Sequence, residues 1–145
     1  MRTPTVVVGY DGSEDAQHAV EWAARTAGAL GAELCIVHAV GLLEHAGLAG
    51  AAAVDDEPAL TRASAAGLDR GRVQWRVEDG DPCSALLRVA EQAQEDGATV
   101  LLVVGSRGSG GHAGTVLGST SLELAEHSHV PVTIVPPRHR RYREA

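Results

Sequence analysis

The fold is decided by the stretch TVLLVVGSRGSGGHAGTVLGSTS, which spans residues 99–121. Residues 99–105 form the most apolar segment of the chain, and their length and β-branched content predict a strand that is buried on both faces. Glycine-rich sequence follows, and residues 118–127 have the pattern of a short helix. A buried strand that leads through a loop into a helix is typical of a parallel sheet covered by helices.

The rest of the chain alternates between the same two patterns. We predict strands at Thr5–Gly9, Glu33–Val40 and residues 73–78, 99–105 and Val132–Val135, and helices at residues 14–30, 58–68, 82–96 and 118–127. This alternation, with right-handed crossovers, predicts a doubly wound α/β fold with a five-stranded parallel sheet and helices on both faces. We expect one domain over residues 1–145, with a flexible loop at residues 41–56 and a basic tail at residues 138–145.

Composition excludes several functions. The net charge of −7 speaks against nucleic acid as a partner, because a phosphate-backbone surface needs excess positive charge. The chain has no Lys and no Asn, so neither a Walker A phosphate loop nor a protein-kinase catalytic set is present. No apolar run has the length of a signal sequence or a membrane span. We therefore expect a cytoplasmic protein without a membrane partner, in which Cys35 and Cys83 are reduced thiols.

Ligands of open parallel sheets bind at the carboxyl ends of the strands, and one unusual residue at these ends is Asp11. It follows the first predicted strand and precedes a helix that begins after Ser13. A turn at the start of that helix also accounts for the Asp-Gly pair, which is a common turn dipeptide, so a binding role and a structural role both stay open.

The glycine-rich loop is the second unusual segment at these ends. Glycines let backbone N–H groups approach an anion, and the predicted helix start at Gly118 and Ser119 favours phosphate. Arg107 adds charge, and the hydroxyls of Ser119, Thr120 and Ser121 add donors. A loop that is simply solvated is the alternative. The dinucleotide-like pattern at residues 108–113 is rejected, because it follows the fourth strand and the next strand ends without an acidic residue.

Sets of catalytic or metal-binding residues are sparse. The chain has no G-x-S-x-G elbow, and His127 and His129 lie too close in sequence to share one face of a helix. We interpret His38 as a core or rim residue of the second strand.

The residues at the strand ends resemble the universal stress protein family. The family signature G-x2-G-x9-G-[ST] is matched by Gly105, Gly108, Gly118 and Ser119, and the opening VVVGYDGSEDAQHAVEWAARTA and the ending VPVTIVP are similar to its first strand and helix and its closing strand. The resemblance implies a Rossmann-like sheet of order 3-2-1-4-5, like that of the adenine-nucleotide α-hydrolases. It also implies bound ATP with Mg, and a homodimer joined through the last strand, whose exposed edge is suited to pairing.

Carried over position by position, the resemblance assigns Asp11 to the ribose or the metal of ATP, and the end of the second strand to the adenine. The nucleotide-binding set that it implies is Gly9, Tyr10, Asp11, Ala39, Val40, Val104, Gly105, Ser106, Arg107, Gly108, Gly118, Ser119, Thr120 and Ser121. We expect a nucleotide-dependent regulator of the stress or energy response, with an unknown protein partner. Two alternatives are a slow Mg-dependent ATPase and a nucleotide-free dimer that binds other proteins.

Overall fold

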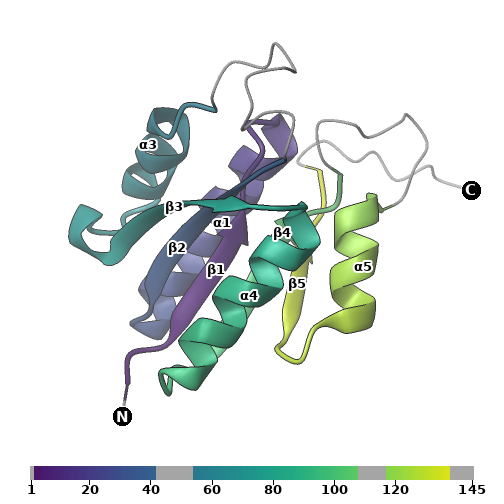
Figure 1. The fold of residues 1–145 in the computed structure, drawn as a ribbon. Coiled ribbons are helices and arrows are strands. Elements are labelled where there is room, and N and C mark those ends of the chain that lie inside the picture. The colour runs from purple at the N-terminus through teal and green to yellow at the C-terminus, as the bar shows by residue number, and fades with distance from the viewer. Residues whose placement is uncertain (1, 42–53, 108–116, 138–145) are drawn as a thin grey trace, which may run out of the picture.

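A computed structural model describes residues 2–41, 54–107 and 117–137. Its centre is one parallel sheet of five strands, in the order β3-β2-β1-β4-β5. The predicted fold class and strand order are thereby confirmed (Figure 1). The strands are β1 (Thr5–Gly9), β2 (Glu33–Val40), β3 (Val73–Asp79), β4 (Val100–Gly105) and β5 (Val132–Val135).

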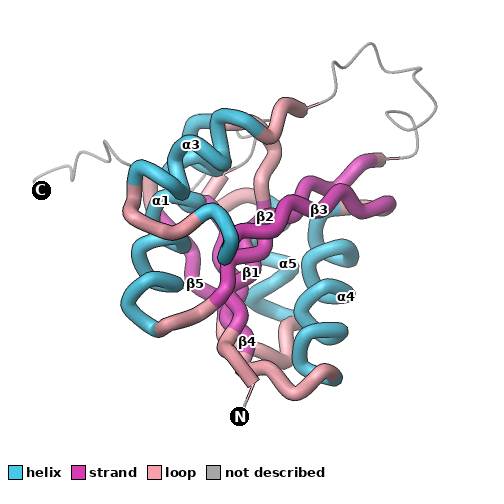
Figure 2. The backbone as a smooth tube through the Cα atoms, turned by 90° about the vertical axis from the view of Figure 1, so that its left-hand side faces the viewer, coloured by secondary structure: helices cyan, strands magenta, loops and turns pink. Residues whose placement is uncertain are grey.

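Helices cover both faces of this sheet. In chain order they are α1 (Glu14–Leu30), α3 (Glu57–Ala65), the short 3-10 helix η1 (Arg70–Arg72), α4 (Pro82–Glu95) and α5 (Ser119–His127). Figures 1 and 2 show α1 and α3 on one face and α4 and α5 on the other. Among the described residues, no helix combines the length and the apolarity that crossing a membrane requires.

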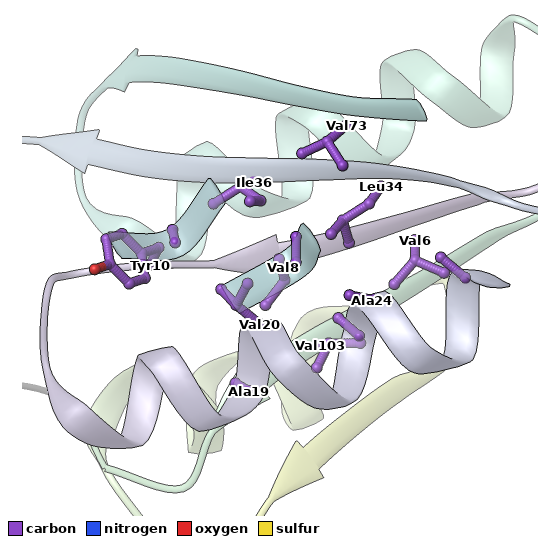
Figure 3. Packing of buried hydrophobic residues seen from close by; sticks show 14 of the residues in the cluster. Val6, Val8, Tyr10, Ala19, Val20, Ala24, Leu34, Ile36, Val73 and Val103 are labelled. Atoms are coloured by element: carbon purple, nitrogen blue, oxygen red, sulfur yellow. The ribbon is translucent and has the colours of Figure 1, made fainter. Parts of the chain in front are cut away.

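The two faces of the sheet hold two separate apolar clusters, because successive side chains of a strand point to opposite faces. Val6 and Val8 of β1 pack with α1 and α3, and Figure 3 shows this cluster around Val20 and Ile36. Val7, between them, belongs to the other cluster, which α4 and α5 cover. Both faces of β1 are fully buried, as its uninterrupted valine run predicts.

The helix boundaries follow from local chemistry. Ser13 caps α1 by accepting a hydrogen bond from the N–H of Ala16, and Asp81 caps α4 by accepting one from the N–H of Ser84. The predicted helix at residues 58–68 is too long at its end, since α3 stops at Ala65. Gly67 takes a positive φ of 93°, and the buried Leu68 turns back so that its N–H bonds to the carbonyl of Ala63.

The edge formed by the carboxyl ends of β1 and β4 also receives the N-termini of α1 and α5 (Figure 1). Of the predicted loop at residues 41–56, the described part is Gly41 and residues 54–56, which lead into α3. Residues 42–53 and the predicted tail at 138–145 lie outside the described residues.

Candidate functional site

Tyr10, a buried aromatic residue, directly follows the end of β1. Tyr10 is 4% exposed and lies among the buried apolar residues of Figure 3. Its N–H bonds to the carbonyl of Val37, and its ring meets that of Trp75 edge-on, with 5.7 Å between the ring centroids. Its carbonyl lies 3.0 Å from Nδ1 of His38; a carbonyl only accepts, so the proton is on Nδ1. Burial raises the pKa of the Tyr10 phenol, although a hydrogen bond with Gln17 opposes this. Both main-chain polar groups of Tyr10 thus have partners within the protein, and its side chain belongs to the core.

Asp11 lies in the turn that follows. Its Oδ1 accepts a hydrogen bond of 2.9 Å from the N–H of Ser13, which is the pattern of an Asx turn. Gly12 between them has a φ of 84°, a conformation that favours glycine. Asp11 therefore has the structural role that the sequence left open, since its side chain holds the turn at the start of α1. A ligand role remains compatible with it, because a carboxylate has several acceptor positions.

Ala39 and Val40 lie at the end of β2, half-buried and beside β3. Glu78 is the register partner of Ala39, and the carbonyl of Val40 accepts a hydrogen bond of 3.0 Å from the N–H of Gly80. The turn after β3 thus uses the carbonyl of Val40, one of the main-chain groups at the end of β2 that we predicted to bind adenine.

Three hydrogen bonds join the ends of β4 and β5 to the start of α5. The N–H of Ser106 donates a hydrogen bond to the carbonyl of Val135. The carbonyl of Ser106 accepts a hydrogen bond of 2.6 Å from the N–H of Gly118. Ser121 is buried, and its hydroxyl donates to the carbonyl of Gly105 over 2.7 Å. Two donors expected to contact phosphate, the Gly118 amide and the Ser121 hydroxyl, are therefore used within the protein. They fix the start of α5 against the end of β4.

The first turn of α5 keeps the groups that favour an anion. The cap residue of this helix, Gly118, has no side chain that could cap it, and the N–H groups of a first helical turn have no partner within the helix. Ser119 is exposed and Thr120 is half-buried. Ser106, whose carbonyl bonds to the N–H of Gly118, has a buried Oγ with no hydrogen-bond partner among the described residues. A phosphate group fits this donor set.

Arg107, which follows the end of β4, forms an ion pair with Asp15 of α1. Its Nε lies 3.3 Å from Asp15 Oδ2, and the two side chains are 35% and 20% exposed. The backbones meet beside this pair, since a Cβ on Gly105 would lie 3.1 Å from the carbonyl oxygen of Asp15. From sequence alone we predicted a ligand role for Arg107, and for Asp15 only a place in the first turn of a helix.

Other predicted positions have packing roles. Val104 is buried in the cluster under α4, and a Cβ on Gly9 would lie 2.9 Å from Leu86 Cδ1. Gly108 lies outside the described residues. Within the described ranges, no three His, Cys, Asp or Glu side chains form a group that could hold a metal ion. A magnesium ion there would rely on the oxygens of a bound phosphate together with Asp11.

The structure brings the predicted residues of β1 and β4 to one edge, because Val8 and Val103 are paired neighbours and Asp11 and Arg107 follow them. Sequence reasoning missed Asp15 as a partner of Arg107, and the contact of His38 with Tyr10. The alternation along β2 offered one signal, because His38 lies on the same face as the buried Leu34 and Ile36.

Comparisons with known proteins agree on one family. The sequence model of the universal stress protein family matches residues 3–136. Universal stress protein Rv1636 of Mycobacterium tuberculosis is 36% identical over 146 residues, which cover 90% of this chain and 94% of that protein. Universal stress protein Rv2623 of the same organism is 35% identical over 90% of this chain, but over 46% of its own length. The chain thus spans about half the length of several curated relatives that it matches.

Solved structures give the same result. A crystal structure of a universal stress protein in complex with cAMP has a TM-score of 0.66 and 38% identity, covering 91% of this chain and 95% of its own. The universal stress protein UspA from Lactobacillus plantarum has a TM-score of 0.72 at 20% identity, covering 93% of this chain and 99% of its own, which is a likeness of fold.

Proposed function

Because the chain belongs to the universal stress protein family, we propose that it binds an adenine nucleotide at the carboxyl ends of β1 and β4. The observation that carries this proposal is the N-terminus of α5, which has no side-chain cap from Gly118 and is bonded to Ser106, whose buried hydroxyl has no partner within the described part of the chain. Amide dipoles of this kind hold a phosphate even on a protein with a net charge of −7. The similar structure in complex with cAMP, at 38% identity, supports the same ligand class.

Each part of the site has a distinct role in this proposal. The first-turn amides of α5 bind phosphate oxygens, and Arg107 supplies positive charge. Asp11 accepts from the ribose hydroxyls or helps to hold magnesium. The adenine lies near Ala39 and Val40, at the end of β2. Loop 105–121 encloses the phosphates, and ATP is the nucleotide that we propose.

We further propose that nucleotide occupancy makes the protein a regulator of the stress response in the cytoplasm, acting as a homodimer. The dimer would form through β5, the outer strand of the sheet beside β4. An edge strand has unpaired main-chain groups, so pairing with a second copy is physically reasonable.

The deciding experiment is calorimetric titration with Mg-ATP, AMP and cyclic AMP. We expect binding at sub-millimolar concentration, and loss of binding in a variant that combines Asp11→Ala and Gly118→Val. Val73→Ala, a buried position at the start of β3 and so at the opposite edge of the parallel sheet, is a control that leaves the ligand groups in place. The proposal fails if the folded protein binds none of the three nucleotides. Phosphate release by the wild type and by Asp11→Asn tests the alternative of a slow ATPase.

A further inference from the structure

The ion pair between Asp15 and Arg107 has a consequence for which nucleotides bind. Arg107 is the single Lys or Arg in residues 105–121, so it is the main source of side-chain positive charge for a ligand there. In the structure its charge is matched by Asp15, at 3.3 Å. A phosphate that uses Arg107 must either replace Asp15 or bind beside its negative charge.

Asp15 is held in this position by the backbone. A Cβ on Gly105 would lie 3.1 Å from the Asp15 carbonyl oxygen and 3.4 Å from Asp15 Cβ, so the first turn of α1 packs directly on the end of β4. Asp15 also lies in the first turn of α1, where the helix dipole stabilises a carboxylate without help from Arg107. The carboxylate therefore stays in place whether or not Arg107 turns to a ligand.

We infer that Asp15 is a specificity-determining residue: by matching the charge of Arg107, it lets ATP bind less tightly than Arg107 alone would allow and so narrows the preference of the site for ATP over a singly charged phosphodiester. The inference rests on the proposed nucleotide site and specifies its charge preference. A singly charged phosphodiester, as in cyclic AMP, loses little binding affinity from its repulsion by the nearby carboxylate. A triphosphate carries several negative charges and is repelled more strongly, because the repulsion grows with the charge of the ligand.

The test compares Asp15→Asn with Glu14→Gln. Both variants remove one carboxylate from the first turn of α1, but Glu14 is exposed, and Asp15 is the residue paired with Arg107. Relative to Glu14→Gln, we expect Asp15→Asn to raise the affinity for ATP about two- to fivefold, the range of a partly exposed ion pair, and to change that for cyclic AMP less. In an Arg107→Gln background Asp15→Asn should still raise the affinity for ATP above that of Glu14→Gln, because the Asp15 carboxylate repels the phosphates directly.

The outcomes separate two kinds of failure. If the wild type binds nucleotide but Asp15→Asn matches Glu14→Gln or weakens ATP binding, the inference is overturned and the nucleotide site stands. If neither the wild type nor any variant binds a nucleotide, both are overturned. If Asp15→Asn does not fold, the Nε–H resonance of Arg107 in the wild type decides: it must shift on adding ATP, and an unchanged resonance contradicts the inference.

Discussion

At the scale of single residues, Gly105 shows why a glycine in the signature serves packing as well as binding. Because Gly105 has no side chain, the backbone of Asp15 can pack against it. The carbonyl of Gly105 accepts a hydrogen bond from the hydroxyl of Ser121. Any side chain there would push α1 away from β4. The ion pair of Asp15 with Arg107 depends on this contact.

We predict that Gly105→Ala destabilises the protein by about 1–3 kcal/mol, because the new methyl group is forced against the backbone of α1. Denaturant unfolding measures this change in the free energy of unfolding. Gly28→Ala is the matched control, because Gly28 lies within α1 and a Cβ there would have no described atom within 4 Å outside its own helix turn. That substitution should stabilise the helix by up to about 1 kcal/mol. Equal effects of the two substitutions would contradict the packing role of Gly105.

A second prediction at this scale concerns Cys35. Burial raises the pKa of its thiol to about 11, so the reactive thiolate is scarce at neutral pH. In a Cys83→Ser variant, alkylation of Cys35 by iodoacetamide at pH 7 should be at least about a hundredfold slower than in the unfolded chain, whose thiol has a pKa near 9. Mass spectrometry follows the reaction. Rapid labelling of the native protein would show that this part of β2 opens readily.

At the scale of elements, the helix N-termini differ in how they are capped. Ser13 and Asp81 cap α1 and α4 with their own side chains, whereas α5 begins at Gly118 without a side-chain cap. Capping residues stabilise a helix by satisfying its first N–H groups. An uncapped start beside the end of a buried strand leaves those groups to a ligand or to solvent.

The cap of α4 gives a pH-dependent prediction. Hydrogen bonds from Ser84 lower the pKa of Asp81, so its charged form stabilises the folded state above the unfolded pKa of about 3.9. That contribution is lost as the pH falls through the lower folded pKa. Asp81→Asn should therefore lose less stability than the wild type between pH 4 and about pH 2.5, as urea unfolding measures. Asp96→Asn, at the other end of α4, serves as the control and should follow the wild type.

Most elements could be predicted from the sequence, because each has a local signal. The valine run of β1, the Asp81-Pro82 start of α4 and the apolar β4 are examples. The strand order came from the family resemblance. Contacts between distant segments could not be predicted: Arg107 and Asp15 meet only because Gly105 lets α1 approach.

The site was predictable as a location, less so in its atomic detail. The ring of Tyr10 turns into the core against Trp75, since a strand-end aromatic is buried or exposed according to what packs over it. The hydroxyl of Ser121 is used by Gly105 because that buried carbonyl needs a donor. Neither choice is visible in a single sequence.

At the scale of the whole molecule, the sheet has two edges, β3 and β5. Our proposal of a dimer through β5 predicts that Thr133→Lys, which adds a charge at a half-buried position of β5, shifts the protein towards monomer in analytical ultracentrifugation. Gln74→Lys places the same charge on the other edge, at an exposed position of β3, and should leave the dimer intact. A dimer that survives Thr133→Lys but not Gln74→Lys would assign the interface to β3.

The hydrogen bond between the Gly118 amide and the Ser106 carbonyl closes the chain upon itself at the base of the glycine-rich segment. Strand and helix are thus tied to each other independently of the residues between them. Lengthening or replacing the sequence between them changes the free energy of unfolding little, because the entropic cost of closing a loop grows only slowly with the length of the loop. Ligand choice in this architecture is therefore free to diverge through insertions and exchanges while the scaffold beneath keeps its stability.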